Sequence, residues 1–148
     1  MRKIETRKVI VQNQECWGLY EKDYDNYSLR IRLNESIEKY VCHPRYKYML
    51  CISIPLNDAD ENGFAYPEEC KLLDELELLL RDQLEEQQLS VFAAVITSDG
   101  FRMYIAYTFQ TRVCEEIVQR INDDWVYHDV SVHVQEDKNW ETIASICN

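Results

Sequence analysis

The sequence predicts a single α+β domain with a ferredoxin-like core, in which two helices cover one face of an antiparallel sheet. From residue 46 onward, segments with strand or helix periodicity follow one another as strand, helix, strand, strand, helix, strand, which is the split βαβ order. The 148 residues suffice for one core but not comfortably for two. Only three Gly and three Pro punctuate the chain, and no repeat or low-complexity linker divides it. We therefore expect one domain over residues 1–148.

A strand extension is expected over residues 1–45. The runs "KVIVQNQECWGLY" and "YSLRIRL" are typical of two strands that are joined around Asp25 and Asn26. In the second run apolar residues alternate with Arg30 and Arg32, so only one face is apolar. These strands either extend the edge of the core sheet or cover its helix-free face.

The core is expected over residues 46–135 and begins with the strand "YKYMLCISIPL". A long helix follows from Pro67 to Gln88, because proline has no amide to lose in a first turn and the two glutamates behind it face the positive end of the helix dipole. Six leucines of this helix share one arc: Leu72, Leu73, Leu76, Leu79, Leu80 and Leu84. Leu78 instead points into the polar arc.

A hairpin, a second helix and a last strand complete the predicted core. Asp99-Gly100 between two strand-like runs is a strong hairpin signal, since both turn residues take positive φ. The second helix begins near Thr111, and "VYHDVSVHV" alternates as a strand. The tail, residues 136–148, keeps a helical apolar stripe, so we expect a short helix whose Trp140 packs against the domain.

The stretch "TSDGFRMYIAY" resembles the aromatic strand of RNA-recognition domains, but two features argue against that function. Asp99 stands where a basic residue is usual. In the RNA-binding register Arg102 would lie under the helices, where an unpaired charge costs several kcal/mol. We therefore expect the opposite register, with Phe101 and Met103 in the core and Arg102 and Tyr104 on the helix-free face. No nucleic-acid partner is expected.

The helix-free face holds the candidate residues of a possible enzyme. They are Cys51, Arg102, Tyr104 and His133. The predicted fold places its first strand between the third and the fourth, which brings Cys51 and His133 onto neighbouring strands. A thiol beside a base can act as a nucleophile, although no glycine-rich turn offers an oxyanion donor nearby. A small Cys/His enzyme is the alternative hypothesis.

The charge distribution favours a binding function. The net charge is −11, and residues 57–88 contribute eleven acidic residues against only Lys71 and Arg81. Such a field repels phosphate backbones and attracts basic partners. We expect a basic protein partner to bind the acidic helix at its polar arc, formed by Asp74, Asp82, Glu85 and Glu86.

The sequence also argues against an exported or membrane protein and against a metal or cofactor site. The start "MRKIETRKVIVQNQE" carries charges throughout, and no apolar run could span a bilayer, so we expect a cytoplasmic protein without membrane association. Six cysteines occur without a CxxC pair, which is typical of reduced, buried thiols. The acids of the 58–61 loop lack the calcium-loop spacing. We expect neither a metal site nor a cofactor.

Three runs together resemble a known family: "HPRYKYMLCISIPLNDADENGFAYPEECKLLDELELLL", "TSDGFRMYIAY" and "QEDKNW". They resemble the bacterial domain of unknown function numbered 695. The matching residues are Pro44, Gly63, Pro67, Thr97, Gly100, Arg102, Tyr104, Glu136, Asp137 and Trp140. The chain departs from the family pattern at Phe64-Ala65-Tyr66, which lengthens a turn, and at Lys138, where proline is usual.

The resemblance implies no established activity. Some family members look as if they are joined to a domain similar to the acidic inhibitor of ribonuclease E, which implies regulation through protein binding. Together with the charge pattern, this gives the leading hypothesis of a non-catalytic, cytoplasmic, protein-binding or regulatory domain. An acidic inhibitor or immunity protein that neutralises a basic nuclease toxin is its specific version.

Overall fold

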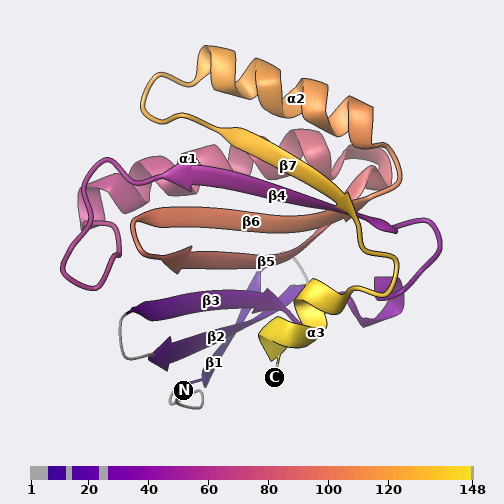
Figure 1. Ribbon diagram of the computed structural model, residues 1–148, viewed down its shortest axis with the longest axis horizontal. Helices are drawn as coiled ribbons and strands as arrows, with labels where there is room; N and C mark the ends of the chain where they lie inside the picture. Colours follow the sequence, from indigo (N-terminus) through magenta and orange to yellow (C-terminus); the bar gives the residue numbers. More distant parts are fainter. Residues whose placement is uncertain (1–6, 13–14, 24–26, 148) are drawn as a thin grey trace.

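The computed structural model describes residues 7–12, 15–23 and 27–147, which form an α+β arrangement around one antiparallel sheet (Figure 1). Within these residues the sheet has seven strands in the order β1-β2-β3-β5-β6-β4-β7. The strands are β1 Arg7–Gln12, β2 Glu15–Asp23, β3 Ser28–Asn34, β4 Tyr48–Pro55, β5 Ser90–Ser98, β6 Phe101–Thr108 and β7 Ser131–Glu136. The helices are α1 Pro67–Leu84, α2 Thr111–Asp124 and α3 Glu141–Cys147, with short 3-10 turns η1 Glu38–Tyr40 and η2 Glu86–Gln88.

The N-terminal strands extend the sheet. β3 pairs with β5, with Arg30 opposite Thr97, so the backbone groups at the β5 edge are satisfied by a ladder. The expected first strand is two strands, β1 and β2, and the predicted junction at Asp25 and Asn26 lies outside the described residues. Of the two alternatives that the sequence left open, the strands therefore extend the edge of the core sheet and do not cover its helix-free face.

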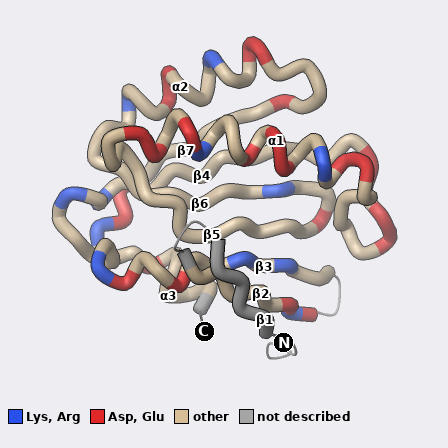
Figure 2. The backbone as a smooth tube through the Cα atoms, turned by 180° about the vertical axis from the view of Figure 1, so that it is seen from behind, with Lys and Arg blue, Asp and Glu red and all other residues tan. Residues whose placement is uncertain are grey.

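Helices α1 and α2 cover the same face of the sheet, as predicted. In Figure 2 α1 lies beside β7 and β4, and α2 lies above it. Their apolar residues join β4 and β6 in one buried cluster, which includes Leu50, Ile52, Leu73, Leu76, Leu80, Leu84, Ile117, Val118 and Ile121. Helix α1 ends at Leu84, four residues earlier than predicted, because Gln87 and Gln88 take positive φ values of 53° and 60°. Leu78 is 63% exposed, as its position in the polar arc indicated.

The opposite face is partly covered by α3 and by the segment before β4. Trp140 is 1% exposed, and its ring stacks on Tyr107 with centroids 3.7 Å apart. Its indole Nε1–H donates to the Tyr46 carbonyl oxygen at 2.8 Å. The predicted tail helix and the packing of Trp140 are confirmed.

The β5–β6 hairpin has the predicted turn, but its side chains lie on the opposite faces of the sheet from those predicted. Asp99 and Gly100 take φ values of 51° and 83°. Tyr104 lies opposite Ile52 and is fully buried under the helices, whereas Phe101 is 46% exposed on the other face. The prediction that Arg102 and Tyr104 lie on the helix-free face was wrong.

A β-bulge adds a second difference in this hairpin. Near the turn, Ser98 lies opposite Phe101 and Ile96 opposite Met103, as a two-residue turn at Asp99 and Gly100 requires. A register shift between Phe92 and Ala94 then places Phe92 opposite Ala106, although the two-residue turn alone predicted Tyr107. The bulge turns Phe92 towards the helices, where it joins the buried cluster.

Candidate functional site

The outward face of α1 carries an exposed leucine among acids. Leu78 is 63% exposed, and Asp74 and Glu75 precede it by one helical turn while Asp82 follows by one turn. All three carboxylates are exposed. Figure 2 shows this red-coloured acidic character along α1. Within the part of the chain that the structure describes, Asp82 makes no ion pair, so its carboxylate is available to a partner.

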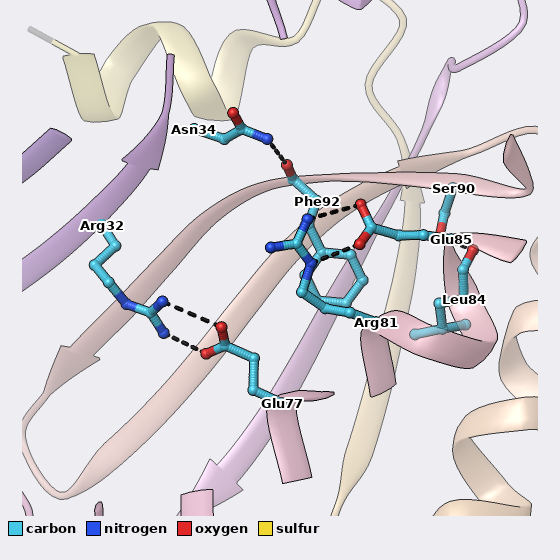
Figure 3. A network of polar contacts seen from close by, with 8 residues as sticks. All are labelled: Arg32, Asn34, Glu77, Arg81, Leu84, Glu85, Ser90 and Phe92. Atoms are coloured by element: carbon cyan, nitrogen blue, oxygen red, sulfur yellow. Dashed lines mark hydrogen bonds and ion pairs between the residues drawn. The ribbon is translucent and has the colours of Figure 1, made fainter. Parts of the chain in front are cut away.

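Glu85 was predicted to bind the partner together with Asp74, Asp82 and Glu86, but it pairs with an arginine of the domain itself. Both of its carboxylate oxygens accept hydrogen bonds from Arg81, at 2.5 and 3.0 Å (Figure 3). The Arg81 guanidinium also faces the ring of Trp17 at 5.3 Å. One helical turn earlier on this side, Glu77 binds Arg32 of β3 through both oxygens. These inward pairs dock α1 on the sheet, and the acids available to a partner are Asp74, Asp82 and Glu86.

A groove of about 420 Å³ separates the end of α1 from the start of α2. Its lining residues are Gln83, Glu86, Gln87, Leu89, Phe109, Gln110, Val113 and Ile117. Val113 is 42% exposed in this groove, and Glu86 at its rim connects the groove with the acidic face of α1. The groove therefore continues the mixed apolar and acidic character of the α1 surface.

The Cys51 and His133 pair lies on the helix-free face, where the sequence placed it. The two residues are directly opposed on β4 and β7. No hydrogen bond joins their side chains in the described structure, and the nearest polar partner of the thiol is Ser53 Oγ at 4.0 Å. Burial raises the pKa of Cys51, which keeps it a thiol. This geometry lacks the activated thiolate that a nucleophilic site requires.

Arg102 and Tyr104 lie on the other face, beneath α1. The Arg102 Nε–H donates to Thr97 Oγ1 at 3.3 Å, and its Nη1 lies 3.9 Å from Asp74 Oδ1. The side chain is 12% exposed. The buried charge of Arg102 is tolerated beneath α1 because Thr97 accepts a hydrogen bond from it and the Asp74 carboxylate lies nearby. The four candidates of the enzyme hypothesis are thus divided between two faces of the sheet.

A buried network that sequence reasoning missed ties α1 to the chain after α2. Trp125 Nε1–H donates to His128 Nδ1 at 3.1 Å, so this nitrogen is an acceptor and Nε2–H donates to Glu69 Oε2 at 2.8 Å. The Asn57 amide N–H also donates to Glu69 Oε2, at 2.6 Å. Burial opposes ionisation of Glu69, but these hydrogen bonds outweigh it and lower its pKa. Glu69 and His128 are 59 positions apart, and neither stood out in the sequence.

The described residues offer neither a metal-binding cluster nor a membrane-spanning helix. Across residues 7–12, 15–23 and 27–147, no three His, Cys, Asp or Glu side chains converge as a metal site would require. None of the helices in these ranges has the length and apolarity needed to cross a bilayer.

The chain matches one known protein family over nearly its whole length. The family described as "Family of unknown function (DUF695)" matches residues 15–145, nearly the whole chain. The chain belongs to the DUF695 family. No curated protein matches it, and no solved structure matches it.

The DUF695 match covers the motif residues around the hairpin tip. The Gly100 N–H donates to the Gly63 carbonyl oxygen at 3.1 Å, and a Cβ on Gly63 would lie 2.6 Å from the Asp99 nitrogen. Gly63 therefore permits this close approach of two loops. In the same DUF695 chain, Thr97 and Arg102 meet beneath α1, so the hairpin motif forms a polar cluster as well as a turn.

Proposed function

We propose that this DUF695 domain is a non-catalytic, protein-binding or regulatory domain that binds a basic protein through the outward face of α1. The observation that carries the proposal is exposed Leu78 among the carboxylates of Asp74, Glu75 and Asp82. An apolar side chain at the centre of a contact supplies affinity, and surrounding charges of one sign steer an oppositely charged partner to it. An acidic inhibitor or immunity protein is the form of this function that we favour.

The groove beside α1 extends the proposed surface. Glu86 stands at its rim and Val113 in its wall. A basic segment that contacts Asp82 and Leu78 reaches the groove just past the end of α1, where Glu86 of η2 follows Asp82 by four residues, and can place a further apolar side chain there. This arrangement is that of a helix or extended peptide laid along two helices.

We further infer that the core is a ferredoxin-like split βαβ unit in a cytoplasmic bacterial protein. The strand order β7-β4-β6-β5 and the packing of α1 and α2 on one face support the fold. Cys16, Cys42, Cys51, Cys70 and Cys114 are all free, which supports a reducing compartment. In this fold the sheet shields one side of α1 and leaves the other to a partner.

The test is a charge reversal with a matched control. The domain carrying Asp82→Lys and Glu86→Lys is compared with the domain carrying Glu115→Lys and Asp124→Lys, which are exposed on α2 and change the net charge equally. Asp74 is retained because its carboxylate faces Arg102. We expect the α1 variant to lose capture of the basic partner from a lysate of the native host, measured by mass spectrometry, while the α2 variant retains it. Equal capture by both variants would refute the proposal.

A single substitution tests the apolar anchor separately. Leu78→Ser removes the exposed side chain without changing charge, and we expect it to accelerate dissociation of the captured partner. The unfolding free energy should stay within about 0.5 kcal/mol, because the leucine is exposed in the free domain. An unchanged dissociation rate would show that Leu78 is not an anchor.

A further inference from the structure

A cluster of arginines lies beneath α1, on the side that faces β3, and the proposed binding surface does not use it. Arg30 of β3 is directly opposite Thr97 of β5, which is directly opposite Arg102 of β6. The neighbouring row places Arg32 and Tyr104 on either side of a β5 valine. Directly opposed residues share a face, so these side chains all belong to the face that α1 covers. Figure 2, which views the sheet from the side of the helices, shows basic segments on both β3 and β6.

Arg102 has unused hydrogen-bonding capacity in this cluster. Its guanidinium carries five N–H donors, and the Nε–H is used by Thr97. The terminal nitrogens have no acceptor in hydrogen-bond geometry within the described residues, since Asp74 Oδ1 is 3.9 Å away. With 12% of the side chain exposed, water satisfies these donors only in part. A buried donor without a partner is unfavourable unless a ligand or an ordered group completes it.

The Tyr104 hydroxyl is the second incomplete group. Tyr104 is fully buried, and its hydroxyl has no hydrogen-bond partner among the described residues. Burial, followed by the charge of Glu77, raises its pKa well above the usual value. The Arg102 guanidinium lies close to this hydroxyl without hydrogen-bond geometry, and together with Arg32 it acts to lower the pKa of Tyr104. The net shift of the pKa is upward, so the group stays protonated and can donate.

The other charges around the cluster are already paired. Glu77 holds Arg32 through both oxygens and is 13% exposed. Glu21 lies 3.3 Å from the Nε of Arg30, whose guanidinium also covers the Phe64 ring. Asp74 is different, because it is 73% exposed and makes no hydrogen bond with Arg102. It can therefore turn towards solvent at little cost and leave Arg102 to an incoming anion.

We propose that Arg102 and Tyr104 bind the phosphate group of a small ligand, with Arg32 contributing positive charge. A guanidinium edge matches two oxygens of an oxyanion, and a tetrahedral phosphate has further oxygens for the tyrosine hydroxyl. A carboxylate is a poorer match, because both of its oxygens would bind the guanidinium and none would remain for the Tyr104 hydroxyl. Arg32 and Asp74 at the edge of the cluster are 31% and 73% exposed, whereas Tyr104 is fully buried, so the phosphate has to enter from this edge as Asp74 turns away.

The experiment is a titration of the full chain with inorganic phosphate, followed by NMR of the arginine Nε–Hε groups. Sodium chloride at matched ionic strength is the control. We expect a saturable shift of the Arg102 signal in the wild-type chain. Tyr104→Phe keeps the ring and should weaken phosphate binding about tenfold, the effect of losing one hydrogen bond to a charged group. Asp74→Asn should strengthen binding, because it removes the competing carboxylate.

Two further variants complete the design. Arg102→Gln removes the reporting signal itself, so its effect is read at the neighbouring Arg32 signal, whose saturable shift it should abolish. Arg112→Gln, which removes an equally charged but 91% exposed side chain on α2, should leave the Arg102 response unchanged. If Arg102→Gln fails to fold, Tyr104→Phe and Asp74→Asn still decide the question. A parallel titration with glycerol 3-phosphate distinguishes a phosphate monoester from the free ion as the ligand. Absence of a saturable shift with either ligand, or equal affinity in the Tyr104→Phe and Asp74→Asn variants, would overturn the proposal.

Discussion

At the scale of single residues, the C-terminal tail is held by an aromatic stack and a carboxylate. Asp137 Oδ2 accepts a hydrogen bond from the Tyr107 hydroxyl at 2.8 Å, and its Oδ1 accepts one from the Glu141 amide at 2.9 Å. Trp140 lies between these groups and the Tyr46 carbonyl. The carboxylate thus caps α3 while the indole ring covers the sheet.

Trp140→Ala should lower the free energy of unfolding by about 3 kcal/mol, because it removes a buried ring and leaves a cavity. Urea denaturation followed by circular dichroism measures this change, with Val126→Ala as a control at a position that is 82% exposed. Full stability combined with loss of partner binding would instead make Trp140 a recognition residue.

Asp137→Asn should remove a pH-dependent part of the stability. Burial opposes ionisation of Asp137, but hydrogen bonds from Tyr107 and from the Glu141 and Thr142 amides outweigh it and lower its pKa. A carboxyl whose pKa is lower in the folded state stabilises fully above its unfolded pKa, about 3.9, and loses this contribution as the pH falls through the folded pKa. The stability difference between wild type and variant should therefore be constant near neutral pH and shrink below about pH 4. A difference that does not change with pH would contradict this role.

Cys51 should react slowly with a thiolate-selective alkylating agent at neutral pH. Its thiol is half-buried and its pKa is raised by burial, whereas Cys42 is exposed. Mass spectrometry of digested protein after timed labelling should show Cys42 modified well before Cys51. Labelling of Cys51 ahead of every other cysteine would restore the enzyme hypothesis.

At the scale of elements, the acidic residues of α1 fall into two groups. Glu77 faces the sheet and holds the helix on it, whereas Asp82 faces outward and has no such role. Glu77→Ala breaks the pair with Arg32 and should cost about 2 kcal/mol, the value of hydrogen bonds to a charged group. Asp82→Ala on the outer edge should change stability by no more than about 0.5 kcal/mol. Chemical denaturation of both variants measures the contrast, and equal losses would show that the Glu77 pair does not dock the helix.

Short-range patterns in the sequence predicted the helices, strands and turns well, but they did not predict which side chains of different elements contact one another. The Asp99-Gly100 turn and the leucine arc of α1 are short-range patterns, and both are present. The facing of β6 depended on whether Arg102 would find partners, and Thr97 and Asp74 became visible as partners only when three elements were assembled. The contact of Glu69 with His128 likewise spans 59 positions, so no local pattern could predict it.

At the scale of the whole molecule, the sheet and α1 together divide the domain into three regions with different chemistry. The outward face of α1 is acidic with one exposed leucine, the cluster beneath it is rich in arginine, and the helix-free face carries Cys51 and His133. The negative charge that dominates the chain is therefore concentrated on one helix, and its inner acids are neutralised by Arg32 and Arg81. A basic partner would be steered to the outer acids alone.

Carboxyl footprinting of the domain with its captured partner tests this account most directly. A water-soluble carbodiimide and an amine label exposed carboxylates, and mass spectrometry reports each site in the free and the bound domain. We predict that labelling of Asp82 and Glu86 falls strongly in the complex, while labelling of Glu115 and Asp124 on α2 is unchanged. Unaltered labelling of Asp82 and Glu86 in a saturated complex would show that the partner binds elsewhere and would contradict the account.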